Sequence, residues 1–370
     1  MFRLNHCLRG VRVLDLSSYL PGPFASQVLA DFGAQVVKIE PPQGDGMRLL
    51  GPRDADGTPA FHAALNAGKT ICRLDLKSDA GRRRLDALLV EADVLIEGFR
   101  PGVMGRLGLG WNDLCAVHPR LIYCSLSGYG LAGPAEQRAG HDANYLAMAG
   151  VLHRNGRPPR FFDPPIADMT SGLYAVIAIL GALEARRRDG RGCHIDLGIA
   201  DVAMPLQSFQ IAALGCTGSP QPETTYLNGG AAYYRVYGTK DGRHVVLGAV
   251  ERKFWQAFCR AAQRPDWVAR HGEPIPQTEL MGEIGRFFAD LTAAECDARF
   301  AAEDCCVTLV LDLAEAVATP HHRERGIVRR DGQGHTQVLF PARVDGEAPT
   351  PRQDLTETGE ARWACETSPA

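Results

Sequence analysis

The chain has 370 residues, more than one ordinary domain needs, and its 45% hydrophobic and 22% charged residues are typical of a soluble globular enzyme. Its net charge of −3 supplies no basic excess for a nucleic-acid backbone, so we expect no nucleic-acid partner. The 11 cysteines form no C-x-x-C pair and the N-terminus has no signal-peptide core, so we expect free thiols and a cytoplasmic protein.

Predicted strands alternate with predicted helices in the first half of the chain. A strand over 11–16, a helix over 24–32 and a strand over 35–40 form a βαβ unit. A second helix is predicted over 79–91, and further strands over 71–76, 93–97, 121–126 and 192–197. The alternation predicts an α/β fold with an open, mostly parallel, Rossmann-like sheet. Because the loop 17–23 lacks G-x-G-x-x-G, a dinucleotide site is weakly supported.

The stretch 140–150 (GHDANYLAMAG) places an imidazole and a carboxylate ahead of a short apolar run. Asp142 can cap that run as a helix, which would hold His141 beside the N–H groups of a helix N-terminus. A base beside such an anion site suits removal of a proton next to a carbonyl. A capping Asp142 and a packed His141 explain the same residues equally well.

Residues 173–187 are apolar nearly all round, which predicts a buried helix. Its most apolar run, 173–183, is too short to span a bilayer, so we expect no membrane partner. Asp168 precedes this helix, and local sequence alone favours a capping role for it. A functional role for Asp168 is supported because the chain brings a second acidic group to the same edge of the sheet, the edge formed by the loops.

The second half begins with a predicted helix over 199–215 and a domain boundary within 219–230. Strands over 233–239 and 243–250 form a hairpin about a D-G turn, and Glu251 follows directly, where a charge is usually solvated. A helix over 284–301, a strand over 306–311, a helix over 313–319, a linker over 320–325 and an extended tail after 348 complete the chain. The adjacent His321 and His322 lack a shared-ligand spacing, so we expect no metal site.

Several blocks of the sequence occur together in one known superfamily. They are LRGVRVLDL at 8–16, DFGAQVVKIE at 31–40, DLKS at 75–78 and FRPGVMGRLG at 99–108. With them, the chain resembles the family III CoA-transferase superfamily of the CaiB/BaiF type, from about residue 8 to about residue 343. The resemblance implies an acyl-CoA thioester substrate and no cofactor beyond the CoA moiety of that substrate.

The sequence contains blocks that resemble each of two branches of the superfamily. The blocks at 140–146, 227–234, 248–254 and 306–308 resemble the α-methylacyl-CoA racemase branch, although Leu309 replaces its usual proline. The blocks at 41–48 and 168–172 resemble the transferase branch. The resemblance therefore implies a 2-methylacyl-CoA racemase or, as the alternative, a CoA-transferase.

The two branches imply different chemistry. In the racemase, His141, paired with Glu251, and Asp168 would stand on opposite faces of the α-carbon and exchange its proton, with helix N-termini as donors to the enolate oxygen. In the transferase, Asp168 would attack the donor thioester and form an aspartyl-CoA thioester. A non-enzymatic acyl-CoA-binding protein is disfavoured, because three ionisable groups stand at the matching catalytic positions.

The resemblance also implies how CoA is held and how the chain is organised. Lys77 and Arg106 would face the CoA phosphates, and Asp142 and Tyr145 would lie near the pantetheine or the thioester. The implied assembly is an interlocked homodimer. We expect a large CoA-binding α/β domain over 1–198, a linker helix over 199–225, a small α+β domain over 226–315, a return linker over 316–328 and a C-terminal part over 329–370 that completes the large domain.

Overall fold

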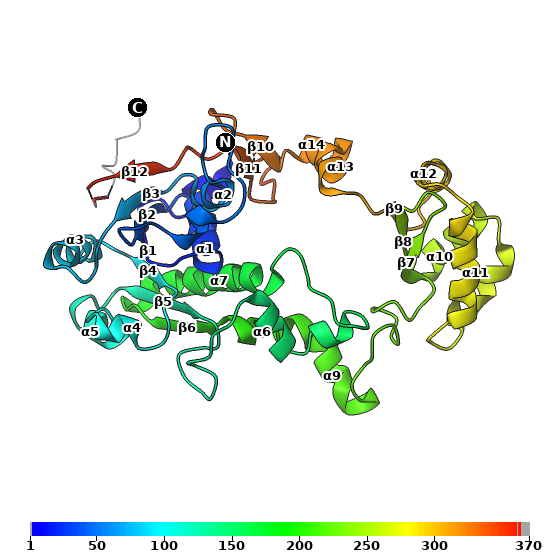
Figure 1. Cartoon of the computed structure of the whole chain (residues 1–370), viewed down its shortest axis with the longest axis horizontal. Helices are drawn as coiled ribbons and strands as arrows, with labels where there is room; N and C mark the ends of the chain where they lie inside the picture. The colour runs from blue at the N-terminus through cyan, green and yellow to red at the C-terminus, as the bar shows by residue number, and fades with distance from the viewer. Residues whose placement is uncertain (1, 361, 364–370) are drawn as a thin grey trace. The chain divides into compact units, whose positions relative to one another are not determined.

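The computed structural model describes residues 2–360, 362 and 363, which form two compact units (Figure 1). The larger unit is drawn from three stretches of the chain, Met1–Ala149, Phe162–Leu206 and Thr319–Ala370. The smaller unit is drawn from Gly150–Phe161 and Gln207–Ala318. The segment Gly150–Phe161, which the sequence had assigned to the large domain, thus groups with the smaller unit.

A parallel sheet forms the centre of the larger unit, and seven of its strands lie in the described residues (Figure 1). Their order is β12-β3-β2-β1-β4-β5-β6. The strands are β1 (Arg12–Asp15), β2 (Gln35–Glu40), β3 (Thr70–Arg73), β4 (Val94–Glu97), β5 (Ile122–Ser127), β6 (His194–Gly198) and β12 (Thr356–Thr358). The predicted parallel α/β sheet is confirmed. The strand order reverses between β1 and β4, the kind of switch point at which open α/β sheets bind ligands.

Helices cover both faces of this sheet because neighbouring strand residues point to opposite sides. Val13 of β1 packs with α1 (Pro21–Asp31) and α7 (Ile166–Asp189). Leu14 packs with α3 (Asp79–Leu89) and α5 (Trp111–Val117) on the other face. The helices of this unit are α1 (Pro21–Asp31), α2 (Ala60–Asn66), α3 (Asp79–Leu89), α4 (Val103–Arg106), α5 (Trp111–Val117), α6 (Asp142–Met148), α7 (Ile166–Asp189), α8 (Ile199–Val202) and α14 (Pro320–Arg325). The stretch 320–325, predicted as a linker, is therefore helical; the Thr319 hydroxyl caps it by accepting from the His322 backbone N–H.

The C-terminal part of the chain returns to the sheet of the larger unit. A hairpin of β10 (Val328–Arg330) and β11 (Thr336–Val338) comes first. The tail, predicted to be extended, then pairs through β12 in parallel with β3. Arg352 anchors it, because its Nη2 lies 2.7 Å from Oδ2 of Asp31 on α1. The edge of the sheet beyond β3 is thus supplied by the last described residues.

The smaller unit combines an antiparallel sheet with helices around an aromatic core. The sheet joins β7 (Tyr234–Gly238), β8 (His244–Gly248) and β9 (Val307–Leu309), which confirms the predicted hairpin. The helices are α9 (Ser208–Thr217), α10 (Arg252–Ala261), α11 (Thr278–Ala289), α12 (Ala293–Phe300) and α13 (Leu313–Ala318). The single helix predicted over 284–301 is wrong: Thr292 and Glu295 form a capping box that starts α12 anew.

The helix α7 is longer than predicted. It runs for 24 residues, and α7 and the segment Ile199–Cys216 are two described helical stretches long and apolar enough to cross a membrane. Core helices of soluble proteins meet the same criterion, and Ala175 and Ile179 of α7 are buried in the core beneath the sheet. The prediction of a buried helix over 173–187 holds for one face only, because Ile177 is 63% exposed. The predicted helix over 199–215 is broken at Pro205, which has no N–H for a helical bond.

Candidate active site

A cavity of about 430 Å³ lies at the carboxyl ends of the central strands of the larger unit. Its walls come from the loops after β1, β4 and β5 and from the start of α6. The side chains that line it are Tyr19, Phe99, Arg100, Ser127, Glu136, Arg138, His141, Asn144 and Tyr145. The cavity therefore occupies the edge at which a parallel sheet binds its ligands, and it holds His141 and Tyr145, two of the residues predicted from the sequence.

Local contacts fix His141 at the start of α6. Its backbone N–H donates to Oδ1 of Asn144 (3.0 Å), and the Tyr145 hydroxyl donates to the Gly140 carbonyl (2.7 Å). A Cβ at residue 140 would lie 2.8 Å from the Tyr129 hydroxyl and 2.8 Å from the Tyr145 ring, so any other residue there would displace one of these side chains. Burial, followed by the nearby charge of Asp168, raises the pKa of Tyr145 to about 12, so its hydroxyl remains a donor. The His141 side chain itself is exposed.

Asp142 joins the start of α6 to the start of α7. Its Oδ1 accepts from the backbone N–H of Ala167 (2.7 Å) and of Asp168 (3.1 Å). The sequence predicted that Asp142 caps its own helix; it instead lies inside the first turn of α6 and caps α7. These two N–H groups of α7 are occupied by the Asp142 carboxylate, so they are not donors to an enolate oxygen as the sequence had suggested.

Asp168 is half-buried in the first turn of α7. Burial, and after it the negative charge of Asp142, raise the pKa of Asp168 to about 7. Near neutral pH such a carboxyl group is present in both protonation states, which is what a general acid or base requires. Asp168 does not itself line the cavity of His141, but its charge acts on Tyr145, which does.

A second cavity, of about 530 Å³, lies beside the first. Lys77, Arg106 and Ser18 line it together with apolar side chains such as Leu74 and Val103. Lys77 and Arg106 are both exposed, so their charges are available to a ligand. Phe99 lines both cavities, so the two adjoin at this ring. An apolar cavity with two cations suits a ligand that carries a flat ring and phosphates.

Glu251 belongs to the smaller unit. It follows β8 and precedes α10, and its side chain is exposed. Burial, and after it the negative charges of Asp304 and Glu251, raise the pKa of the Cys306 thiol. Cys306 is exposed and adopts a left-handed backbone with φ of 55°. The pairing of Glu251 with His141 stays a prediction.

Sequence reasoning missed several residues that line the first cavity. Tyr19 follows β1, Arg100 follows β4, and Arg138 lies in the loop after β5. Arg100 stands within a family block, but its charge alone gave it no role. Arg100 could have been found only from its position after β4, because the ends of β1 and β4 flank the switch point at which such sheets bind ligands. The strand order that creates this switch point cannot be predicted from single segments of sequence.

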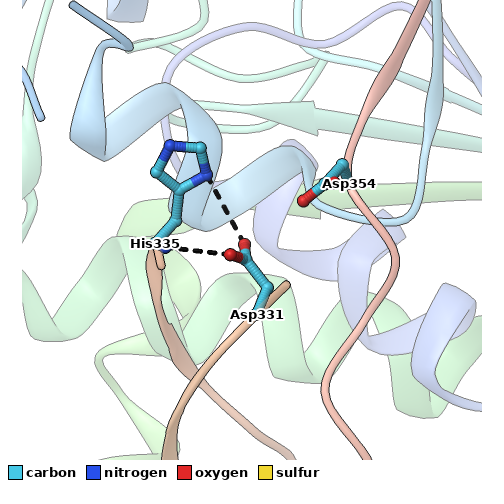
Figure 2. A group of neighbouring side chains, drawn as sticks. All are labelled: Asp331, His335 and Asp354. Carbon is cyan, nitrogen blue, oxygen red and sulfur yellow. Dashed lines mark hydrogen bonds and ion pairs between the residues drawn. The ribbon is translucent and has the colours of Figure 1, made fainter. Parts of the chain in front are cut away.

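One group of side chains in residues 2–360 has the spacing of a metal site. Ligand atoms of Asp331, His335 and Asp354 lie within 4.8 Å of one another (Figure 2). However, His335 Nδ1 is 3.5 Å from Oδ2 of Asp331, and its Nε2 is 3.0 Å from Oδ2 of Asp56. The hydrogen bond with Asp56, set against a smaller effect of burial, raises the pKa of His335, as expected of an imidazolium among carboxylates. We interpret the group as an ion-pair cluster that ties the hairpin β10–β11 to the loop of Asp56.

Comparison with known proteins identifies the family of the chain. The sequence matches CoA-transferase family III over residues 8–360. The chain belongs to this family. The α-methylacyl-CoA racemase of Mus musculus is 36% identical over 339 residues, which cover 88% of this chain and 83% of the relative. The acetyl-CoA:oxalate CoA-transferase of Acetobacter aceti is 31% identical over 348 residues, 91% of this chain and 89% of the relative.

A solved structure shows the same fold. The CaiB/BaiF family protein of Brucella suis superposes with a TM-score of 0.83 at 28% identity, covering 96% of this chain and 97% of that one. The chain is thus an enzyme of the family III CoA-transferase superfamily. Its relatives include racemases and transferases at similar identity, so the reaction of this family III enzyme must be argued from its own residues.

Proposed function

We propose that this family III enzyme racemises the α-carbon of a 2-methylacyl-CoA thioester by transferring a proton between its two faces. The observation that carries the proposal is the junction of α6 and α7. Asp142, the residue next to His141, accepts hydrogen bonds from the start of α7, and the pKa of Asp168 is about 7. These hydrogen bonds join the helix starts that carry His141 and Asp168, which supports the proposal that the two residues act as a pair.

The proposed reaction uses these groups in opposite roles. One removes the α-proton, the electrons of the C–H bond move into the thioester to form an enolate, and the other group returns a proton to the opposite face. His141 and Asp168 are the proposed pair, with Glu251 orienting the imidazole. The chemistry needs no cofactor beyond the CoA of the substrate.

The raised pKa of Asp168 supports the racemase proposal. A nucleophile must be ionised, and a carboxyl group with a pKa of about 7 is only partly so at neutral pH. A general acid or base performs best when its pKa is near the working pH. The pKa of Asp168 therefore favours proton transfer over attack on a thioester.

Exchange with heavy water tests this proposal. One enantiomer of 2-methyldecanoyl-CoA is incubated with the enzyme in deuterium oxide. We expect deuterium at the α-position together with loss of chirality. A protein that leaves the α-hydrogen in place while it moves CoA to an added free acid would contradict the racemase assignment.

CoA transfer through Asp168 is the second candidate, and a specific observation favours it. The acetyl-CoA:oxalate CoA-transferase relative covers as much of the chain as the racemase does, and residues 168–172 (DMTSG) follow the transferase pattern. In this case hydroxylamine should cleave the aspartyl-CoA thioester during turnover with a donor thioester and a free acid, releasing CoA and leaving a hydroxamate on Asp168. The α-hydrogen should then not exchange with deuterium oxide.

We also propose that the enzyme acts as an interlocked homodimer. Support comes from the family resemblance and from apolar side chains that a single chain leaves exposed: Ile177 on α7 is 63% exposed and Phe209 on α9 is 79% exposed. A partner surface would cover such side chains. Sedimentation at micromolar concentration should give twice the mass of one chain; the mass of one chain would contradict a stable dimer.

A further inference from the structure

Tyr19 has an unusual backbone conformation. Its φ is 65°, one of five positive φ angles among the described residues other than glycine. The left-handed region is unfavourable for a residue with a bulky side chain, so the surrounding structure must hold it there. Such residues cluster at functional sites, where the strain is retained because it holds the side chain in the position that the function requires.

A buried ion pair holds Tyr19 in place. Its backbone N–H donates to Oδ1 of Asp45 (3.2 Å), and Oδ2 of Asp45 lies 3.0 Å from Nζ of Lys38. The Lys38 ammonium also donates to the carbonyl of Ser17 (2.7 Å). The side chain of Lys38 is fully buried and that of Asp45 nearly so. The loop from Ser17 to Tyr19 is therefore held by the buried ion pair of Lys38 and Asp45. Separating these two charges would leave each of them buried and unpaired, which is strongly unfavourable.

The ring of Tyr19 is not itself part of the core. It is 50% exposed, and it lies over Gly46, where a Cβ would come within 2.5 Å of the Tyr19 hydroxyl. It lines the cavity that holds His141, whereas the preceding residue, Ser18, lines the cavity of Lys77 and Arg106. The strained turn thus stands where the two cavities meet, between the predicted phosphate-binding cations and the predicted base.

We propose that Tyr19 is a specificity-determining residue whose ring forms the wall against which the thioester arm of the substrate packs. This proposal rests on the proposed function, because it takes the substrate to run from Lys77 and Arg106 to His141. A rigid aromatic face at this point would contact the acyl-CoA beside the reacting carbon. The strain at Tyr19 is then retained for substrate recognition rather than for folding.

Tyr19→Gly separates a recognition role from a structural one. Glycine adopts positive φ freely, so this variant removes the strain together with the ring. We expect KM for α-proton exchange of 2-methyldecanoyl-CoA to rise about tenfold, kcat to stay within about threefold, and Tm to be unchanged or higher. Tyr19→Phe, which keeps the ring, should stay within about twofold of the parent in KM.

Gln263→Gly is the matched control, because Gln263 has a φ of 57° on the smaller unit and is exposed. It should relieve similar strain with no change in KM. The proposal is overturned if Tyr19→Gly keeps the parent KM, if its Tm falls by more than about 5 °C, or if Tyr19→Phe loses as much as Tyr19→Gly.

Failure of the proposed function gives a different result. If the parent enzyme shows no exchange, racemisation is wrong, and the affinity for 2-methyldecanoyl-CoA measured by calorimetry replaces KM as the readout. A tenfold weaker Kd in Tyr19→Gly would still support the ring as a substrate wall, and an unchanged Kd would overturn it.

Discussion

At the scale of single residues, the chemistry depends on two neighbouring carboxyl groups with different environments. Asp142 accepts two backbone hydrogen bonds, whereas Asp168 is half-buried and faces the charge of Asp142. Because burial and a like charge both disfavour the ionised form, Asp168 holds its proton up to neutral pH. One carboxylate thus organises the site, and its charge adjusts the proton affinity of the other.

This arrangement predicts a pH dependence that is clearest in a variant with a single base. In His141→Ala, only Asp168 remains to remove an α-proton, and it must be deprotonated to do so. Deuterium wash-in for the enantiomer it serves should rise with pH to a plateau, with a midpoint at about 7. Stopped-time mass spectrometry across pH 5 to 9 measures this profile.

Asp142→Asn in the same background provides the control. The amide oxygen still accepts the two N–H bonds, but the negative charge is gone, so the pKa of Asp168 should fall and the midpoint should move to lower pH. Burial should keep it above the ordinary value of an aspartate. The same midpoint with aspartate and with asparagine at position 142 would contradict the coupling of the two carboxyl groups.

The sequence located the chemistry of these residues but not their contacts. The block around His141 and the aspartate before the long apolar helix were visible as motifs. The capping partner of Asp142 was not, because an aspartate at a helix start caps its own helix by default, whereas Ala167 is brought to it by tertiary packing. Tyr19 was hidden for a similar reason: the proximity of the loops after β1 and β4 depends on the strand order.

At the scale of elements, the junction of α6 and α7 is the feature on which the site depends. Asp142→Ala leaves two N–H groups of α7 without their acceptor, and loss of such a cap costs about 1 kcal/mol. Urea unfolding should therefore show a loss of roughly this size, with Asp142→Asn close to the parent because it keeps an acceptor. Equal stability of parent and Asp142→Ala would mean that the two helix starts are not held together by this residue.

Element boundaries followed from the sequence wherever local rules decide them. The strand β2 has the predicted bounds, and α3 begins at the predicted residue, where Ser78 caps it. The predictions failed where periodic patterns run through a cap or a proline. The apolar spacing over 284–301 continues across Thr292, and that over 199–215 continues across Pro205, so the breaks were overlooked.

At the scale of the whole molecule, the parallel sheet determines where the substrate can bind. The cavity of Lys77 and Arg106 and the cavity of His141 lie along the carboxyl ends of its strands and adjoin at Phe99. A ligand with phosphates at one end and a reacting carbon at the other can follow this edge. The motif order predicted such a sheet, whereas its last strand, β12, came from a tail whose sequence indicates only extended structure.

Lys77→Ala and Arg106→Ala should each weaken the binding of coenzyme A by roughly 3- to 10-fold, since each removes a cation that can bind phosphate. The salt dependence of binding should also become shallower in both variants. Arg83→Ala is the control, because Arg83 is an exposed cation on α3 that does not line the cavity. Calorimetric titration measures the affinity of all three variants for coenzyme A. If Arg83→Ala weakens binding as much as the other two variants do, the affinity depends on the net charge of the protein and not on the cations of the cavity.

The most direct test of the account follows the α-hydrogen of each enantiomer separately in two variants. In deuterium oxide, His141→Ala should exchange the α-hydrogen of one enantiomer of 2-methyldecanoyl-CoA, and Asp168→Asn that of the other, while neither interconverts them. This pattern requires two bases on opposite faces of one carbon. If both variants exchange both enantiomers alike, or if Asp168→Asn loses only CoA transfer, the two-base account is wrong.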